Sequence, residues 1–137
     1  MKSPTILIVD DDESILKIMR KYFERLNYKV HTSRDGESAY KYFVDNDVGL
    51  VISDLKMPKM NGDTLFAEIR DRDPNVPFFL FTGYLEHTSI PILEELGITG
   101  IVEKPLDLES LYQAIEEFLP KLPKKEKKTP ISKQQFQ

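Results

Sequence analysis

Residues 5–9, TILIV, run directly into four acidic residues at 10–13, DDDE, and this boundary decides the fold. The run is apolar after Thr5 and shows no polar alternation, which is typical of a strand covered on both faces. From Ser14 onward, apolar residues recur every three or four positions, which predicts an amphipathic helix. A buried strand followed at once by a helix indicates the first half of a βα unit.

The same alternation continues along the chain. Amphipathic stretches separate or follow four further short apolar runs, at residues 28–32, 48–53, 76–82 and 98–103. Asp107 is expected to cap the last helix, and Pro120 to end it. We therefore expect an α/β fold, a single doubly wound (βα)5 domain of the flavodoxin-like kind, with a five-stranded parallel sheet and helices on both faces.

Charge divides the chain into two parts. The 137 residues contain 19 Lys and Arg and 23 Asp and Glu, a formal net charge of −4. Residues 121–137 hold six Lys and one Glu, which leaves 13 basic and 22 acidic residues in residues 1–120. We expect an acidic domain over residues 1–120 and a flexible Lys-rich tail or linker over residues 121–137.

Composition also excludes several classes of protein. The chain has no cysteine, so disulfides, thiolate metal sites and thiol nucleophiles are excluded. No apolar stretch approaches the roughly 20 residues that span a bilayer, and the first residues do not resemble a signal peptide. The mild net charge argues against a protein that coats nucleic acid. We expect a cytoplasmic domain with no membrane association.

Polar residues that can bind ligands or take part in catalysis lie at the ends of four of the expected strands. Asp10 and Asp11 follow the first strand, Asp54 the third, Thr82 ends the fourth and Lys104 lies at the end of the fifth. Ligands of an open parallel sheet bind outside the carboxyl ends of its strands, where the strand order reverses. These five side chains are therefore expected to converge on one site.

This set of residues favours phosphoryl chemistry. Three carboxylates repel one another unless a cation lies between them. Oxygen ligands without His or Cys suit Mg²⁺, while a lysine and a threonine supply donors for phosphoryl oxygens. Asp54 can act as a nucleophile and form an aspartyl phosphate. The residues thus predict metal-assisted capture of a phosphoryl group on an aspartate.

Four segments in this order resemble the signature segments of the receiver domain of two-component response regulators. They are ILIVDDDES (6–14), VISDLKMPKMNG (51–62), LFTGY (80–84) and IVEKPL (101–106). Each segment alone is a weak signal, but four in order, each at a strand end, are specific. The resemblance covers residues 5 to about 119.

The resemblance assigns the metal and the phosphoacceptor. It implies that Asp54 accepts the phosphoryl group, and that Asp10 and Asp11 hold Mg²⁺, with Mn²⁺ as a substitute. Asp54 itself and the backbone carbonyl of Lys56 are implied as further ligands.

The resemblance also assigns the residues that respond to phosphorylation. Thr82 matches the hydroxyl residue that moves toward the phosphoryl group, and Lys104 matches the lysine that pairs with phosphoryl oxygens. The bond between Lys104 and Pro105 matches the cis peptide of the family, which is energetically accessible for an X–Pro bond.

Three positions modify the family pattern. Ile101 stands near the place where receivers often carry an aromatic switch residue, so it is a weak switch position here. Lys56 and Tyr84 lie two residues after Asp54 and Thr82 respectively, the positions that tune hydrolysis in the family. We hypothesise that they crowd the path of the attacking water and lengthen the life of the phosphorylated form.

The implied function is a phosphorylation switch, not an enzyme acting on other molecules. A sensor histidine kinase or phosphotransfer protein would phosphorylate Asp54. The surface of the fourth helix, fifth strand and fifth helix would then signal to a partner or output domain, or form a phosphorylation-dependent homodimer. Contact with nucleic acid is expected only through an output domain that is not in this sequence.

Two other functions stay open at this point. An aspartate-nucleophile phosphatase also uses carboxylates, Thr and Lys around Mg²⁺, and residues 10–12 contain its D-x-D pattern, but this leaves the segment around Asp54 unexplained. A docking module that works without phosphorylation is disfavoured by the complete set of acidic, Thr and Lys residues.

Overall fold

The computed structural model describes residues 4–83 and 90–120, and it confirms the doubly wound fold. Within these residues the strands form one parallel sheet in the order β2-β1-β3-β4-β5. The strands are β1 (Thr5–Val9), β2 (Lys29–Ser33), β3 (Val48–Ser53), β4 (Phe78–Thr82) and β5 (Gly100–Glu103). The helices are α1 (Glu13–Arg25), α2 (Gly36–Asp45), α3 (Gly62–Arg72), α4 (Ile90–Glu95) and α5 (Leu108–Ile115), followed by a 3₁₀ turn, η1 (Glu116–Phe118). The Lys-rich tail, residues 121–137, lies outside the described residues.

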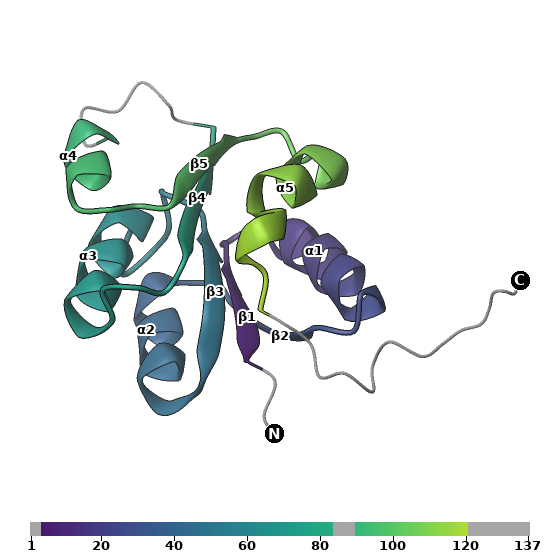
Figure 1. Ribbon diagram of the computed structural model, residues 1–137, viewed down its shortest axis with the longest axis horizontal. Coiled ribbons are helices and arrows are strands. Elements are labelled where there is room, and N and C mark those ends of the chain that lie inside the picture. The colour runs from purple at the N-terminus through teal and green to yellow at the C-terminus, as the bar shows by residue number, and fades with distance from the viewer. Residues whose placement is uncertain (1–3, 84–89, 121–137) are drawn as a thin grey trace, which may run out of the picture.

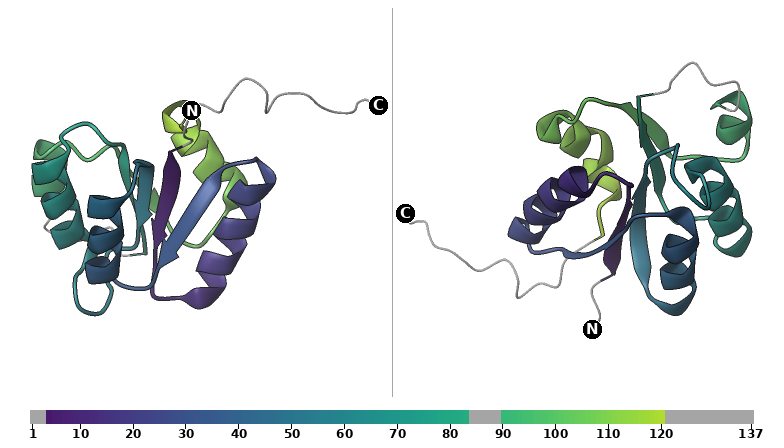
Figure 2. Two further views of the ribbon diagram at one scale, coloured as in Figure 1. Left: turned by 90° about the horizontal axis from the view of Figure 1, so that it is seen from below. Right: turned by 180° about the vertical axis from the view of Figure 1, so that it is seen from behind.

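Helices cover both faces of the sheet (Figures 1 and 2). Helices α1 and α5 lie on one face, and α2, α3 and α4 lie on the other. Successive residues of β1 serve both layers: Ile6 packs in the cluster of α1 and α5, and Leu7 in the cluster of α2 and α3. Because side chains of a strand alternate between faces, a strand buried on both sides is apolar at most of its positions, as β1 is after Thr5.

Local polar contacts set the ends of the helices. The side chain of Asp12 accepts a hydrogen bond from the backbone N–H of Ser14 at the start of α1. The side chain of Asp107 does the same for α5 by accepting from Glu109 and Ser110, which confirms the expected cap. Helix α4 is followed by Gly97 with φ of +89°, a left-handed conformation that favours glycine.

Within residues 4–83 and 90–120, none of the helices has the length and apolar character needed to cross a membrane.

Three strands begin later than the apolar runs suggested, because the residues before them either donate to a helix or lack an N–H. The N–H of Tyr28 donates to Phe23 O in the last turn of α1, so β2 starts at Lys29. Pro77 has no N–H, and β4 starts at Phe78. The N–H of Ile98 donates to Leu93 O in α4, and β5 starts at Gly100.

The order of the strands reverses between β1 and β3, and this places the acidic residues. Asp10 follows β1 and Asp54 follows β3, so the two residues meet at the point where the strand order reverses. Backbone hydrogen bonds fix both positions: Asp54 N donates to Val9 O at 2.8 Å, and Asp10 N donates to Ser33 O at 3.1 Å.

Candidate functional site

Three carboxylates gather at the carboxyl end of the sheet. Asp10, Asp11 and Asp54 each offer an oxygen, and these oxygens lie within 4.8 Å of one another. Asp10 and Asp54 are buried, whereas Asp11 is exposed at the mouth of the cluster. The structure therefore brings together the three acidic residues that the sequence singled out.

Lys104 faces this cluster from the end of β5. Its ammonium nitrogen Nζ lies 3.1 Å from Oδ2 of Asp10 and 3.2 Å from Oδ2 of Asp54. The ammonium also lies 5.4 Å from the centre of the Phe81 ring, within the range of a cation–π contact. Lys104 thus joins the ends of three strands through one charged group.

Burial dominates the electrostatics of the cluster. It raises the pKa of Asp10, and the nearby charge of Asp54 raises this pKa further. Burial also raises the pKa of Asp54, although Lys104 partly opposes the change. Burial lowers the pKa of Lys104, but the two carboxylates outweigh this effect and its pKa is raised. The single ammonium of Lys104 does not fully balance the negative charge of the two buried carboxylates.

These residues fit a divalent cation. Oδ2 of Asp10 is buried and accepts no hydrogen bond from a described residue, although Lys104 lies beside it. An oxygen-only set of three carboxylates, one of them reachable from solvent, suits a hard cation that keeps some of its water. The site can therefore hold a divalent metal ion through Asp10, Asp11 and Asp54.

The loop between β3 and α3 shapes the remaining wall. Oδ1 of Asp54 accepts a hydrogen bond from Leu55 N at 2.8 Å, which orients the carboxylate. Met57 N donates to Oδ1 of Asn61 at 3.1 Å, closing the loop around Lys56, whose side chain is exposed. The loop thus holds the backbone of Lys56 two residues beyond Asp54.

Gly62 permits the close return of this loop. A Cβ atom at Gly62 would lie 2.1 Å from the carbonyl oxygen of Asp54 and 3.0 Å from the Cα of Leu55. The N–H of Gly62 donates to Leu55 O at 2.7 Å. Only a residue without a Cβ allows α3 to start this close to Asp54.

The other expected positions lie on β4 and β5. Thr82 is buried at the end of β4, and its carbonyl accepts a hydrogen bond from Lys104 N at 2.9 Å. The peptide bond between Lys104 and Pro105 is cis. Ile101 is half-buried, is paired with Leu80 in the sheet and packs against the cluster of α2 and α3. Tyr84, the proposed tuning residue, lies outside the described residues.

Three contributors were missed by reasoning from the sequence. Two of them are Asn61 and Gly62, whose Asn-Gly pair at the start of α3 was a usable signal. Phe81 carried no signal, because it resembles any other apolar residue of a buried strand.

The comparison with known families agrees with this geometry. A family model described as the response regulator receiver domain matches residues 6–116. The chain belongs to this family. It is therefore the receiver domain of a two-component response regulator, and the fold is that of CheY-type receivers.

The curated relatives of this chain are longer than the chain itself. The chain is 36% identical over 121 residues to the transcriptional regulatory protein GlrR of Escherichia coli, covering 86% of this chain and 27% of that protein. It is 33% identical over 120 residues to the response regulator SaeR of Staphylococcus aureus, covering 87% of this chain and 52% of that protein. The chain thus spans about a quarter to a half of the length of these relatives.

Solved receivers share the fold over nearly their whole length. The response regulator TrrA of Thermotoga maritima, in complex with Mg²⁺ and BeF, superposes with a TM-score of 0.76 at 28% identity, covering 85% of this chain and 99% of TrrA. A CheY-like receiver of Methanospirillum hungatei gives a TM-score of 0.80 at 25% identity, covering 85% of this chain and 93% of that chain.

Proposed function

We propose that Asp54 is the phosphoacceptor of this receiver. The carrying observation is the position of its carboxylate, which is bonded through Oδ1 to Leu55 N and faces Lys104 through Oδ2. This carboxylate borders a second acidic group, Asp10, in a site reached from solvent past Asp11. Asp10 has similar contacts, since its Oδ1 accepts from Asp12 N at 2.9 Å and its Oδ2 lies 3.1 Å from Lys104. Its side chain is 2% exposed, however, whereas that of Asp54 is 10% exposed, so of these two carboxylates Asp54 is the more accessible to an incoming phosphoryl group.

The proposed step is an in-line displacement at phosphorus. An oxygen of Asp54 attacks the phosphoryl group of a phosphohistidine on a sensor histidine kinase or a phosphotransfer protein. The new P–O bond forms as the P–N bond breaks, and the electron pair stays on the imidazole nitrogen, which takes a proton from solvent. The product is an aspartyl phosphate.

Asp10, Asp11 and Asp54 would hold Mg²⁺, with the carbonyl of Lys56 as a further ligand. When bound, the cation would offset the negative charge of the carboxylates and of the transferring phosphoryl group. The complex of TrrA with Mg²⁺ and BeF supports this assignment in a related receiver.

Lys104 and Thr82 would stabilise the transferred group. The Lys104 ammonium already lies 3.2 Å from Oδ2 of Asp54, so it can move its contact to a phosphoryl oxygen without a large displacement. Thr82 would donate its hydroxyl to a second oxygen. Because the two residues share a backbone hydrogen bond, a change at one is transmitted to the other.

These changes would reach the surface of α4, β5 and α5. Lys104 follows β5 directly, and Ile101 on the same strand would report the change only by packing. A downstream partner, an output domain or a second copy of the receiver would bind the altered surface. Lys56 and Tyr84 would slow hydrolysis by crowding the attacking water.

Phosphorylation of the intact chain tests the proposal. We expect incubation with phosphoramidate and Mg²⁺ to add the mass of one phosphoryl group, and size-exclusion chromatography to report any dimer. Asp54→Asn and an EDTA sample are the controls. A phosphoryl mass that persists in Asp54→Asn would refute the assignment, and turnover of a generic phosphate ester would favour a phosphatase instead.

A further inference from the structure

A hollow between α1 and β2 lies outside the site described above. Its volume is about 410 Å³, and Glu13, Leu16, Lys17, Arg20, Thr32 and Arg34 line it. Tyr22, two residues after Arg20 and thus on the opposite side of α1, contacts Tyr112 of α5. The hollow therefore faces away from α5 and opens beside the edge strand β2.

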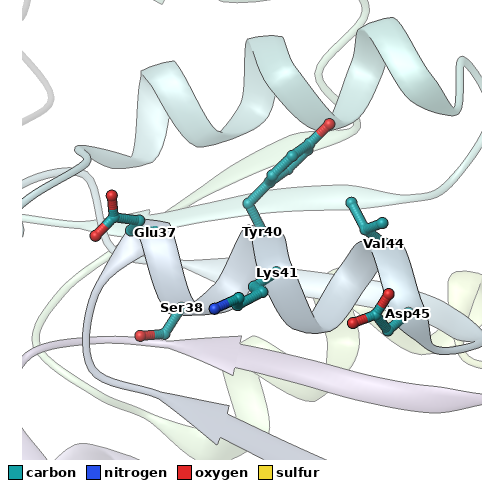
Figure 3. A pocket seen from close by; sticks show the side chains of 6 residues that line it. All are labelled: Glu37, Ser38, Tyr40, Lys41, Val44 and Asp45. Carbon is teal, nitrogen blue, oxygen red and sulfur yellow. The ribbon is translucent and has the colours of Figure 1, made fainter.

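The charge of this hollow differs from that of two others on the surface. The hollow on α2 is lined by Glu37, Lys41 and Asp45 among others, and Figure 3 shows Lys41 between the two carboxylates. A hollow beside the start of β3 contains Asp47, Arg72 and Asp73.

Each of those two carries a net charge of −1, whereas the α1–β2 hollow has three cations and one carboxylate, a net charge of +2. In a domain with 13 basic and 22 acidic residues, this concentration of positive charge selects for anions.

The cations of the hollow are only loosely paired. Arg20 lies 3.9 Å from Glu24, and Arg34 lies 3.9 Å from Glu13, distances well beyond the 2.7–2.9 Å of a charge-assisted hydrogen bond. Lys17 forms no ion pair with a described residue. Arg34 can therefore turn toward an oxyanion at little cost, and neither guanidinium has to break a short ion pair to bind one.

One contact already orients a donor toward β2. Nη2 of Arg20 donates to Oγ1 of Thr32 at 3.1 Å, which holds the guanidinium over the edge strand. The planar fork of a guanidinium matches the oxygens of a phosphate. Leu16 supplies an apolar wall beside these polar groups.

We propose that this hollow binds a small organic phosphate monoester. The charge of a monoester, close to −2 at neutral pH, balances the net charge of +2. The volume exceeds that of the phosphate group alone and lies in the range of small-molecule sites, so an organic group fits beside Leu16. The proposal does not depend on phosphorylation of Asp54.

Phenyl phosphate is a suitable probe for NMR titration of the full ¹⁵N-labelled chain. EDTA is present throughout and ionic strength is held constant, so that the acidic site takes no part. We expect saturable shifts of amides in residues 13–20 and 32–34. Benzoate, which has the same ring but a single charge, should bind at least about fivefold more weakly.

Two double variants distinguish binding in the hollow from general electrostatic attraction to the protein. Arg20→Gln with Arg34→Gln should weaken binding about tenfold or more, since two guanidinium contacts are lost. Arg25→Gln with Arg72→Gln removes the same charge at exposed positions outside the hollow and should leave binding within about twofold. Non-saturable shifts, equal binding of benzoate, or an equal loss in both double variants would overturn the proposal.

Discussion

Lys104 and Asp10 form an ion pair of 3.1 Å that joins the end of β5 to the end of β1. The Asp10 side chain is 2% exposed and that of Lys104 is 22% exposed, so the pair lies largely out of water. Asp54 shares the same ammonium at 3.2 Å. One ammonium therefore neutralises part of the charge of two buried carboxylates, and the stability of the site depends on that ammonium.

Removal of the Lys104 charge should destabilise the metal-free receiver. Breaking a fully buried ion pair costs about 3–5 kcal/mol, but Lys104 keeps partial contact with water, so we expect Lys104→Met to lower the free energy of unfolding by about 1–3 kcal/mol. Urea denaturation in EDTA measures this change. Excess Mg²⁺ should recover part of the loss, because it supplies another positive charge.

Lys41→Met is the matched control, since Lys41 is exposed on α2. Its effect should stay within about 0.5 kcal/mol. Equal losses in the two variants would show that the contacts of the Lys104 ammonium with Asp10 and Asp54 add nothing to the stability of the receiver.

Because the pKa of Asp10 is raised, replacing Asp10 with a neutral residue should stabilise the metal-free receiver, unlike the loss of the Lys104 charge. Folded Asp10 holds a proton more tightly than the unfolded chain does, so its unfavourable contribution is complete at pH 7 and declines as pH falls through the raised pKa toward 3.8. In EDTA at pH 7, Asp10→Asn should therefore increase the free energy of unfolding by about 1 kcal/mol. Urea curves between pH 7 and pH 4.5 should show this advantage shrinking.

Bound Mg²⁺ should make the parent protein more stable than Asp10→Asn. At ten times its Kd, Mg²⁺ would stabilise the parent by about 1.4 kcal/mol, whereas Asp10→Asn lacks a ligand and should gain less. A variant that gains as much from Mg²⁺ as the parent would exclude Asp10 as a ligand.

The sequence predicted the fold and the cluster for physical reasons. The change from uninterrupted apolar runs to helical spacing marks each βα unit, and parallel strands bring their carboxyl ends to one edge. Asp10, Asp54 and Lys104 could therefore be placed together without coordinates. Contacts that depend on the exact path of a loop could not, and the approach of Gly62 to the carbonyl of Asp54 is the clearest example.

Gly62→Ala should disturb Asp54 directly. The new Cβ would start 2.1 Å from the Asp54 carbonyl oxygen, so α3 or the end of β3 must shift. We expect a loss of about 1–3 kcal/mol in the free energy of unfolding, the usual cost of overpacking, together with slower phosphorylation by phosphoramidate. Intact mass against time gives the rate.

Gly83→Ala provides the comparison from the same end of the sheet. A Cβ there would meet only Lys104 Cβ, at 3.9 Å, which is an ordinary contact. Stability and phosphorylation rate should both stay close to the parent values. If Gly83→Ala slows phosphorylation as much as Gly62→Ala, the close approach of Gly62 to Asp54 is not the cause.

His31 should give the receiver a second, opposite pH dependence. Its ring stacks on Tyr42 of α2 at 3.7 Å and 7°, and burial, followed by the charge of Arg20 on α1, lowers its pKa. The folded state then binds a proton less readily than the unfolded chain, so the contribution of His31 is complete above its ordinary pKa of 6.5 and is lost as pH falls below it.

A comparison of the parent with His31→Gln isolates this effect from the carboxylates. Between pH 7.5 and pH 5, the parent should lose about 0.5 kcal/mol more than the variant, a small value because the ring is only half-buried. Tyr42→Leu tests the cause, since removal of the stacked ring admits water to His31 and should return its NMR-measured pKa toward 6.5. Parallel stability curves for the parent and His31→Gln, with an unshifted histidine titration in the parent, would contradict the prediction.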